Sequence, residues 1–184
     1  MQKSGSREEI ALLYLAMARA AGLSANAMKV VYRQRGIFDP SYLSSSQLQD
    51  TLVVLTIGGK QIPVDPGEEM CTFQVIQWRH SSVSGFMQSG DGRFVGSTAA
   101  QPYTENKLVR TGDIVLDGQG NITGTLNLTM NGQEALYWRQ QALKRDDSAI
   151  KRQFERGLKA QLPEGIEAHL DHFSALDDPA TPLI

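Results

Sequence analysis

Residues 50–66 read DTLVVLTIGGKQIPVDP, and this stretch decides the fold of the first part of the chain. Residues 50–57 carry apolar side chains at both odd and even positions, so both faces of a strand would be buried. Gly58 and Gly59 suit the positive φ angles of a tight turn, and residues 61–64 return as a second strand. We therefore expect an antiparallel hairpin whose first strand lies inside a sheet.

A helix precedes this hairpin. Ser6 and Glu9 have the spacing of a capping box, in which each side chain accepts a hydrogen bond from the other residue's backbone N–H. The helix should begin at Arg7, and Gly22 is typical of a helix C-terminus. Residues 10–21 are almost all apolar or alanine. This composition predicts a helix that is buried on most sides.

The chain changes character in its second half, after a polar stretch rich in glycine and serine between Gln88 and Lys107. Beyond that stretch, alternating patterns predict two strands, two short helices and a further strand, at residues 108–116, 122–130, 134–143, 148–158 and 166–173. We expect an α+β fold in two units. Residues 1–90 would pack the helix on an antiparallel sheet, which also includes a strand at 27–32. Residues 105–184 would form a β-rich unit with two short helices.

Composition excludes several classes of function. The formal net charge is -2 over 184 residues, which gives no basic surplus for nucleic acid. No apolar run approaches the roughly 20 residues that span a bilayer. Cys71 is the one cysteine, so neither an internal disulfide nor a cysteine-based zinc site is predicted. We expect no cofactor and no membrane span in these residues.

The helix and hairpin also carry a family resemblance. The residues concerned are Gly5–Arg7, Ile10–Leu23, Ser46–Asp50, Val53–Val54, Gly58–Lys60 and Val64–Pro66. In this pattern, residues 3–87 resemble the bacterial transglutaminase-like superfamily, whose fold is that of the cysteine proteases. Residues 121–126 and 177–179 resemble the β-rich domain that follows it in multidomain cell-envelope proteins. On this resemblance, we expect the first unit to be truncated at its N-terminus and the second at its C-terminus.

The resemblance implies a site with three positions. Members of the family place a nucleophilic cysteine at the start of the helix, a histidine on the next strand and an aspartate on the following strand. The matching positions here are Arg7, Asp50 and Asp65. A guanidinium stays protonated and cannot act as a nucleophile. The resemblance therefore implies a transglutaminase-like fold that lacks the nucleophilic cysteine and the histidine.

We hypothesise that Arg7, Asp50 and Asp65 form a charge cluster that serves as a binding site. Positions 50 and 65 have matching parity for one sheet face, and carboxylates would compensate an arginine at a helix N-terminus. Each residue also has a simpler interpretation. Arg7 would be a solvated first-turn residue, Asp50 a surface residue at a strand start, and Asp65 a turn residue before proline.

The function that we expect is a noncatalytic module that binds or scaffolds peptide or protein, in the periplasm or cell envelope by resemblance alone. One alternative is a cysteine-peptidase or acyltransferase type of hydrolase with its nucleophile elsewhere, for which Cys71 is the one thiol. Another is a purely structural segment of a larger protein. His80 has no partner in sequence, and His169 and His172 would lie on opposite faces of a strand.

Overall fold

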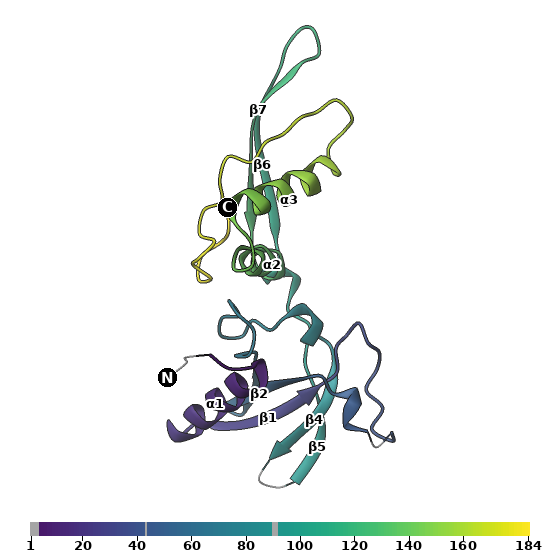
Figure 1. The fold of residues 1–184 in the computed structure, drawn as a ribbon, viewed down its shortest axis with the longest axis vertical. Helices are drawn as coiled ribbons and strands as arrows, with labels where there is room; N and C mark the ends of the chain where they lie inside the picture. Colours follow the sequence, from purple (N-terminus) through teal and green to yellow (C-terminus); the bar gives the residue numbers. More distant parts are fainter. Residues whose placement is uncertain (1–3, 43, 90–91) are drawn as a thin grey trace. The chain divides into compact units, whose positions relative to one another are not determined.

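The computed structural model describes residues 4–42, 44–89 and 92–184, and it divides into two compact units, Met1–Gln101 and Pro102–Ile184 (Figure 1). Both units combine helix with antiparallel sheet, so the α+β class is confirmed. Each unit has its own clusters of buried apolar side chains.

The first unit is a five-stranded antiparallel sheet in the order β3-β2-β1-β4-β5, with helix α1 packed on β1 and β2 (Figure 1). The helix and strands are α1 Arg7–Ala20, β1 Ser24–Val30, β2 Asp50–Ile57, β3 Lys60–Val64, β4 Ser84–Ser89 and β5 Gly92–Ser97. Two short 3-10 turns, η1 Ser45–Gln47 and η2 Trp78–His80, lie in the connections.

The predicted hairpin is confirmed. β2 has a hydrogen-bonded neighbour on each side, and Gly58 and Gly59 turn with φ of +58° and +77°. The capping box at Ser6 and Glu9 is also present, and α1 begins at Arg7. Local signals of turn and cap therefore predicted these elements to within a residue or two.

The burial predicted for α1 is wrong. Only Ala11, Leu15 and Ala18 are buried, against a sheet face that includes Val53, whereas Met17 is 63% exposed. A single helix lying on one sheet presents one face to it. Among the described residues nothing covers the opposite face of α1, although that face is also apolar.

The polar stretch between Gln88 and Lys107, which we expected to separate the two units, contains both β5 and the boundary between the units after Gln101. β5 pairs with β4 from Ser84↔Ser97 to Ser89↔Gly92, so the first sheet continues past residue 90. Few of these residues have strong strand propensity, but pairing with a neighbouring strand satisfies their backbone groups.

The second unit consists of a two-stranded hairpin and two helices (Figure 1). Its elements are η3 Tyr103–Glu105, β6 Leu108–Leu116, β7 Ile122–Met130, α2 Gln133–Ala142 and α3 Asp147–Lys159. The bounds of both strands are those predicted, and Asp146 caps α3 by accepting a hydrogen bond from the Ala149 N–H. In the core of the second unit, Trp138 and Phe154 pack edge to face, with ring centroids 5.1 Å apart.

The strand predicted at residues 166–173 is wrong, because this segment is irregular. Leu170 and Phe173 still pack on the core of the second unit. The residue that bridges to the end of β7 is Leu183, which exchanges two backbone hydrogen bonds with Met130. The described part of this unit therefore contains less strand than we expected.

Candidate functional site

The three positions implied by the resemblance come from one end of the first sheet. Asp50 is the first residue of β2, Asp65 directly follows the last residue of β3, and Arg7 is the first residue of α1. Val53 pairs with Val64, so the start of β2 and the end of β3 lie side by side. A Cβ atom added at Gly67 would lie 2.7 Å from the Arg7 carbonyl oxygen, so the turn after Asp65 passes close beneath the start of α1.

His80 joins the two aspartates. Its Nδ1 lies 2.7 Å from Asp65 Oδ2, and its Nε2 lies 3.1 Å from Asp50 Oδ2. The imidazole is only 1% exposed. Because a neutral imidazole has a single N–H, donation to both carboxylates needs the protonated ring.

Arg79 also contacts the imidazole of His80, because its Nε lies 3.3 Å from His80 Nε2. Burial and the Arg79 charge both lower the pKa of His80, but the hydrogen bonds to Asp50 and Asp65 outweigh them, and the pKa is raised. Burial likewise opposes the shift at Asp50, where hydrogen bonds from His80 and Tyr32 lower the carboxyl pKa. The two carboxylates that engage the ring nitrogens of His80 therefore favour its protonated form.

Arg7 reaches this cluster through a different carboxylate. Its Nε lies 2.9 Å from Glu68 Oε1, and the guanidinium of Arg79 contacts both Glu68 and Asp50. The Glu68 side chain is 6% exposed, and burial raises its pKa, although Arg79 opposes the shift. Among the described residues, Arg7 makes no ion pair with Asp50 or Asp65.

We call Arg7, Asp50, Asp65, Glu68, Arg79 and His80 the ion network. It brings Asp50 and Asp65 together on His80, and it connects Arg7 to them through Glu68 and Arg79. Its three carboxylates face two guanidiniums and the imidazole of His80. Sequence reasoning missed His80, Glu68 and Arg79. Of these three, only Glu68 could have been placed near Asp65 from the local sequence. It follows Asp65 by three residues, and Pro66 and Gly67 between them are typical of a turn.

Cys71 lies near the ion network but is not activated by it. Burial raises the pKa of its thiol, and the negative charges of Asp65 and Glu68 raise it further. Both ring nitrogens of His80 already have partners, so neither is available to take a proton from the thiol. Cys71 is thus held as a neutral thiol in this site.

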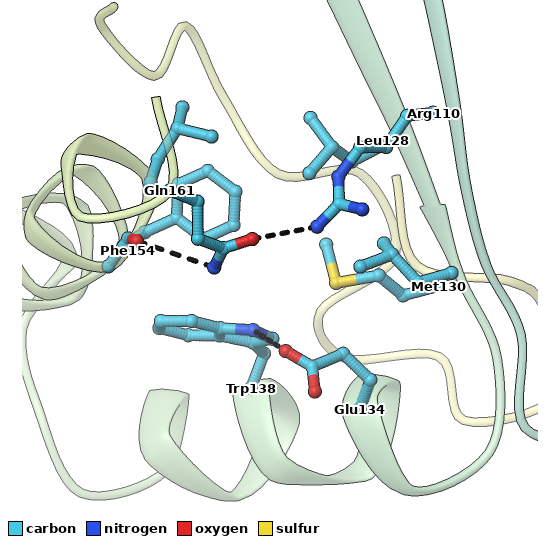
Figure 2. A pocket seen from close by; sticks show the side chains of 10 residues that line it. Arg110, Leu128, Met130, Glu134, Trp138, Phe154 and Gln161 are labelled. Atoms are coloured by element: carbon cyan, nitrogen blue, oxygen red, sulfur yellow. Dashed lines mark hydrogen bonds between the residues drawn. The ribbon is translucent and has the colours of Figure 1, made fainter. Parts of the chain in front are cut away.

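The second unit contains two hollows. Figure 2 shows the smaller, a pocket of about 60 Å³ where Arg110 donates to Gln161 and the Trp138 indole N–H donates to Glu134. It is too small for an organic ligand, because ligand pockets usually have several hundred Å³. Its polar groups satisfy one another, so we interpret it as part of the packing.

The larger hollow is an apolar groove of about 630 Å³ between β7 and residues 166–174. It includes His169 and His172, whose ring nitrogens have separate carboxylate partners in Glu155 at 3.8 Å and Asp171 at 2.9 Å. The two imidazoles therefore do not share a partner. No group of three or more His, Cys, Asp or Glu side chains in the described residues is arranged to hold a metal ion.

Comparison with known proteins adds no family assignment. No family model, curated protein or solved structure matches the chain. Within the part of the chain that the structure describes, every helix is too short or too polar to cross a bilayer.

Proposed function

We propose that this chain is a noncatalytic, transglutaminase-like module that binds or scaffolds peptide or protein. The observation that carries the proposal is the ion network, which includes Arg7 and Asp50, the residues that the resemblance puts in place of the nucleophile and the general base. Arg7 has no reactive lone pair, and Asp50 is engaged by His80 and Arg79. A site with this composition can hold a partner by charge but offers no nucleophile.

The state of Cys71 supports the same proposal against the hydrolase alternative. A cysteine hydrolase needs a thiolate within hydrogen-bond reach of a base. The raised pKa of Cys71 works against the thiolate, and His80 has no free nitrogen to act as that base.

The exposure of Arg7 supports a binding role. Its side chain is 49% exposed, although its Nε is paired with the nearly buried Glu68. The terminal nitrogens of the guanidinium therefore remain available for a carboxylate or a peptide carbonyl. Placement in the bacterial periplasm or cell envelope belongs to this proposal too, and it comes from the resemblance alone.

Two measurements test the proposal. In the first, the protein is incubated with a glutamine-containing peptide and a labelled primary amine, and with a chromogenic amide. We expect no turnover above that of Cys71→Ala. Turnover that Cys71→Ala abolishes would establish the hydrolase or acyltransferase alternative instead.

The second measurement is a titration of the ¹⁵N-labelled protein with synthetic peptides of acidic, neutral and basic composition. We expect the amide signals of residues 7 and 68 to shift with at least one peptide, and Arg7→Gln to weaken that binding. Lys60→Gln is the matched control, because Lys60 is exposed at the opposite end of the β2–β3 hairpin. Absence of any shift with all three peptides would leave the structural-segment alternative in place of a binding module.

A further inference from the structure

Arginine and aromatic side chains gather beside the ion network, on the segment after β1 and on the turn η2. Arg33 lies over the ring of Trp78, with its Cζ 5.1 Å from the ring centroid, and Arg35 lies 5.9 Å from the ring of Tyr32. The Arg33 N–H donates to the Arg79 carbonyl oxygen at 2.9 Å, so the two segments are joined through their backbones. We call Tyr32, Arg33, Arg35 and Trp78 the arginine–aromatic patch.

The charges of this patch are not neutralised as those of the ion network are. Arg7 and Arg79 face carboxylates, but in the described residues no carboxylate lies within 4.0 Å of Arg33 or Arg35. Arg33 makes one long hydrogen bond to Ser81, at 3.4 Å, and Asp39 accepts its bonds from Ser41. Two exposed positive charges therefore remain, on a chain whose formal net charge is -2.

The geometry also prepares these arginines for an anionic partner. A guanidinium that stacks on an aromatic ring keeps its N–H groups in the plane, where they can still donate to a carboxylate. Stacking also restricts the side chain before binding, which reduces the entropy lost on contact. Trp78 is 45% exposed, so it offers apolar contact next to the charges.

The chemistry of the patch favours a peptide over a polyanion. Two free arginines on a protein with no basic surplus are too few for the many phosphate contacts that nucleic-acid binding requires. One or two carboxylates beside an apolar side chain match both the charges and the exposed tryptophan.

We propose that the arginine–aromatic patch binds an acidic segment of a protein partner, with glutamate or aspartate side chains on Arg33 and Arg35 and an apolar side chain on Trp78. This inference rests on the proposed binding function and names the chemistry of the partner. The patch lies directly beside the ion network, because Arg79 also lies over the Tyr32 ring, with its Cζ 5.2 Å from the ring centroid, and pairs with Asp50.

The test uses a fluorescently labelled peptide of glutamate and leucine, with binding followed by fluorescence anisotropy. Removing both charges in Arg33→Gln/Arg35→Gln should weaken binding roughly three- to tenfold, as expected for two solvent-exposed charge contacts. The control Lys60→Gln/Lys151→Gln removes the same charge from exposed positions elsewhere and should bind like the wild type. Added salt should weaken binding of the wild type more than binding of the arginine variant, which keeps Arg7.

A second readout places the peptide on the patch. The chain has two tryptophans, so Trp138→Phe leaves Trp78 as the one indole, and its emission should change when the peptide binds. Equal affinities for the arginine and lysine variants would overturn the inference, as would equal binding of a glutamine–leucine peptide. If the glutamine–leucine peptide binds equally well and Arg7→Gln weakens its binding, the proposed function stands and only the inference fails. If no peptide binds, both fail.

Discussion

Substitution of His80 by alanine should destabilise the first unit strongly. Asp65 Oδ2 accepts two hydrogen bonds, from His80 Nδ1 at 2.7 Å and from the Gln77 N–H at 3.0 Å. The Asp65 side chain is 2% exposed, so water cannot replace the lost imidazole. Removing one partner of a buried ion pair typically costs about 3–5 kcal/mol, and we expect the unfolding free energy to fall by that amount.

The assay is urea unfolding followed by the fluorescence of Trp78, in a Trp138→Phe background shared by all variants. Trp78 belongs to the same short turn as His80, so its emission reports on the first unit. His172→Ala is the matched control, because that imidazole is 71% exposed and should cost less than about 0.5 kcal/mol.

A second substitution tests the physical reason. Asp65→Asn removes the buried charge, so in the His80→Ala background it should restore part of the lost stability rather than add to the loss. If His80→Ala costs no more than His172→Ala, or if Asp65→Asn makes it worse, the ion network does not hold the first unit together as we describe.

Three further results are expected. The pKa of His80 is raised above its ordinary value of 6.5, so its stabilisation is fully present below pH 6.5 and is lost as the pH rises through the folded-state pKa. The unfolding free energy of the wild type should decline over that range, and His80→Gln should remove this decline. Burial raises the pKa of Cys71, so iodoacetamide should alkylate it roughly tenfold or more slowly than a cysteine peptide at pH 8, with urea removing the difference. Arg139 is buried and donates to the carbonyl oxygens of Ala175 and Thr181, so Arg139→Met should lower the unfolding free energy reported by Trp138 by roughly 2–4 kcal/mol, and the exposed Arg152→Met should not. Equal effects of the two arginine substitutions would contradict the role of Arg139.

Much of the fold was accessible from local sequence. The hairpin at Gly58 and Gly59 and the capping box at Ser6 depend on residues at most a few positions apart. The strands of the second hairpin were predicted with the bounds that the structure has, because alternation and a glycine-containing loop are local signals. Predictions failed where the structure of a segment depends on which strand lies beside it. Residues 166–173 are not a strand, and β5 was not expected.

The candidate site was likewise only partly predictable from the sequence. The residues at positions 7, 50 and 65 were selected through the family resemblance, but their partners could not be found from the sequence. His80 is 15 positions from Asp65 and 30 from Asp50, and no periodicity connects a turn residue with two strand ends over that distance. Arg7 was expected beside the two aspartates, yet it pairs with Glu68, because the turn through Gly67 places that carboxylate under the helix start.

The sequence by itself therefore determined where the chain turns, caps and alternates, and which residue types stand at the three positions that the resemblance implies. Only the tertiary structure decided which charges meet, because strand pairing brings together residues that are far apart in the chain. It also decided the direction in which the pKa of His80 is shifted, since the pKa of a buried imidazole depends on the carboxylates that the fold places on each side of it.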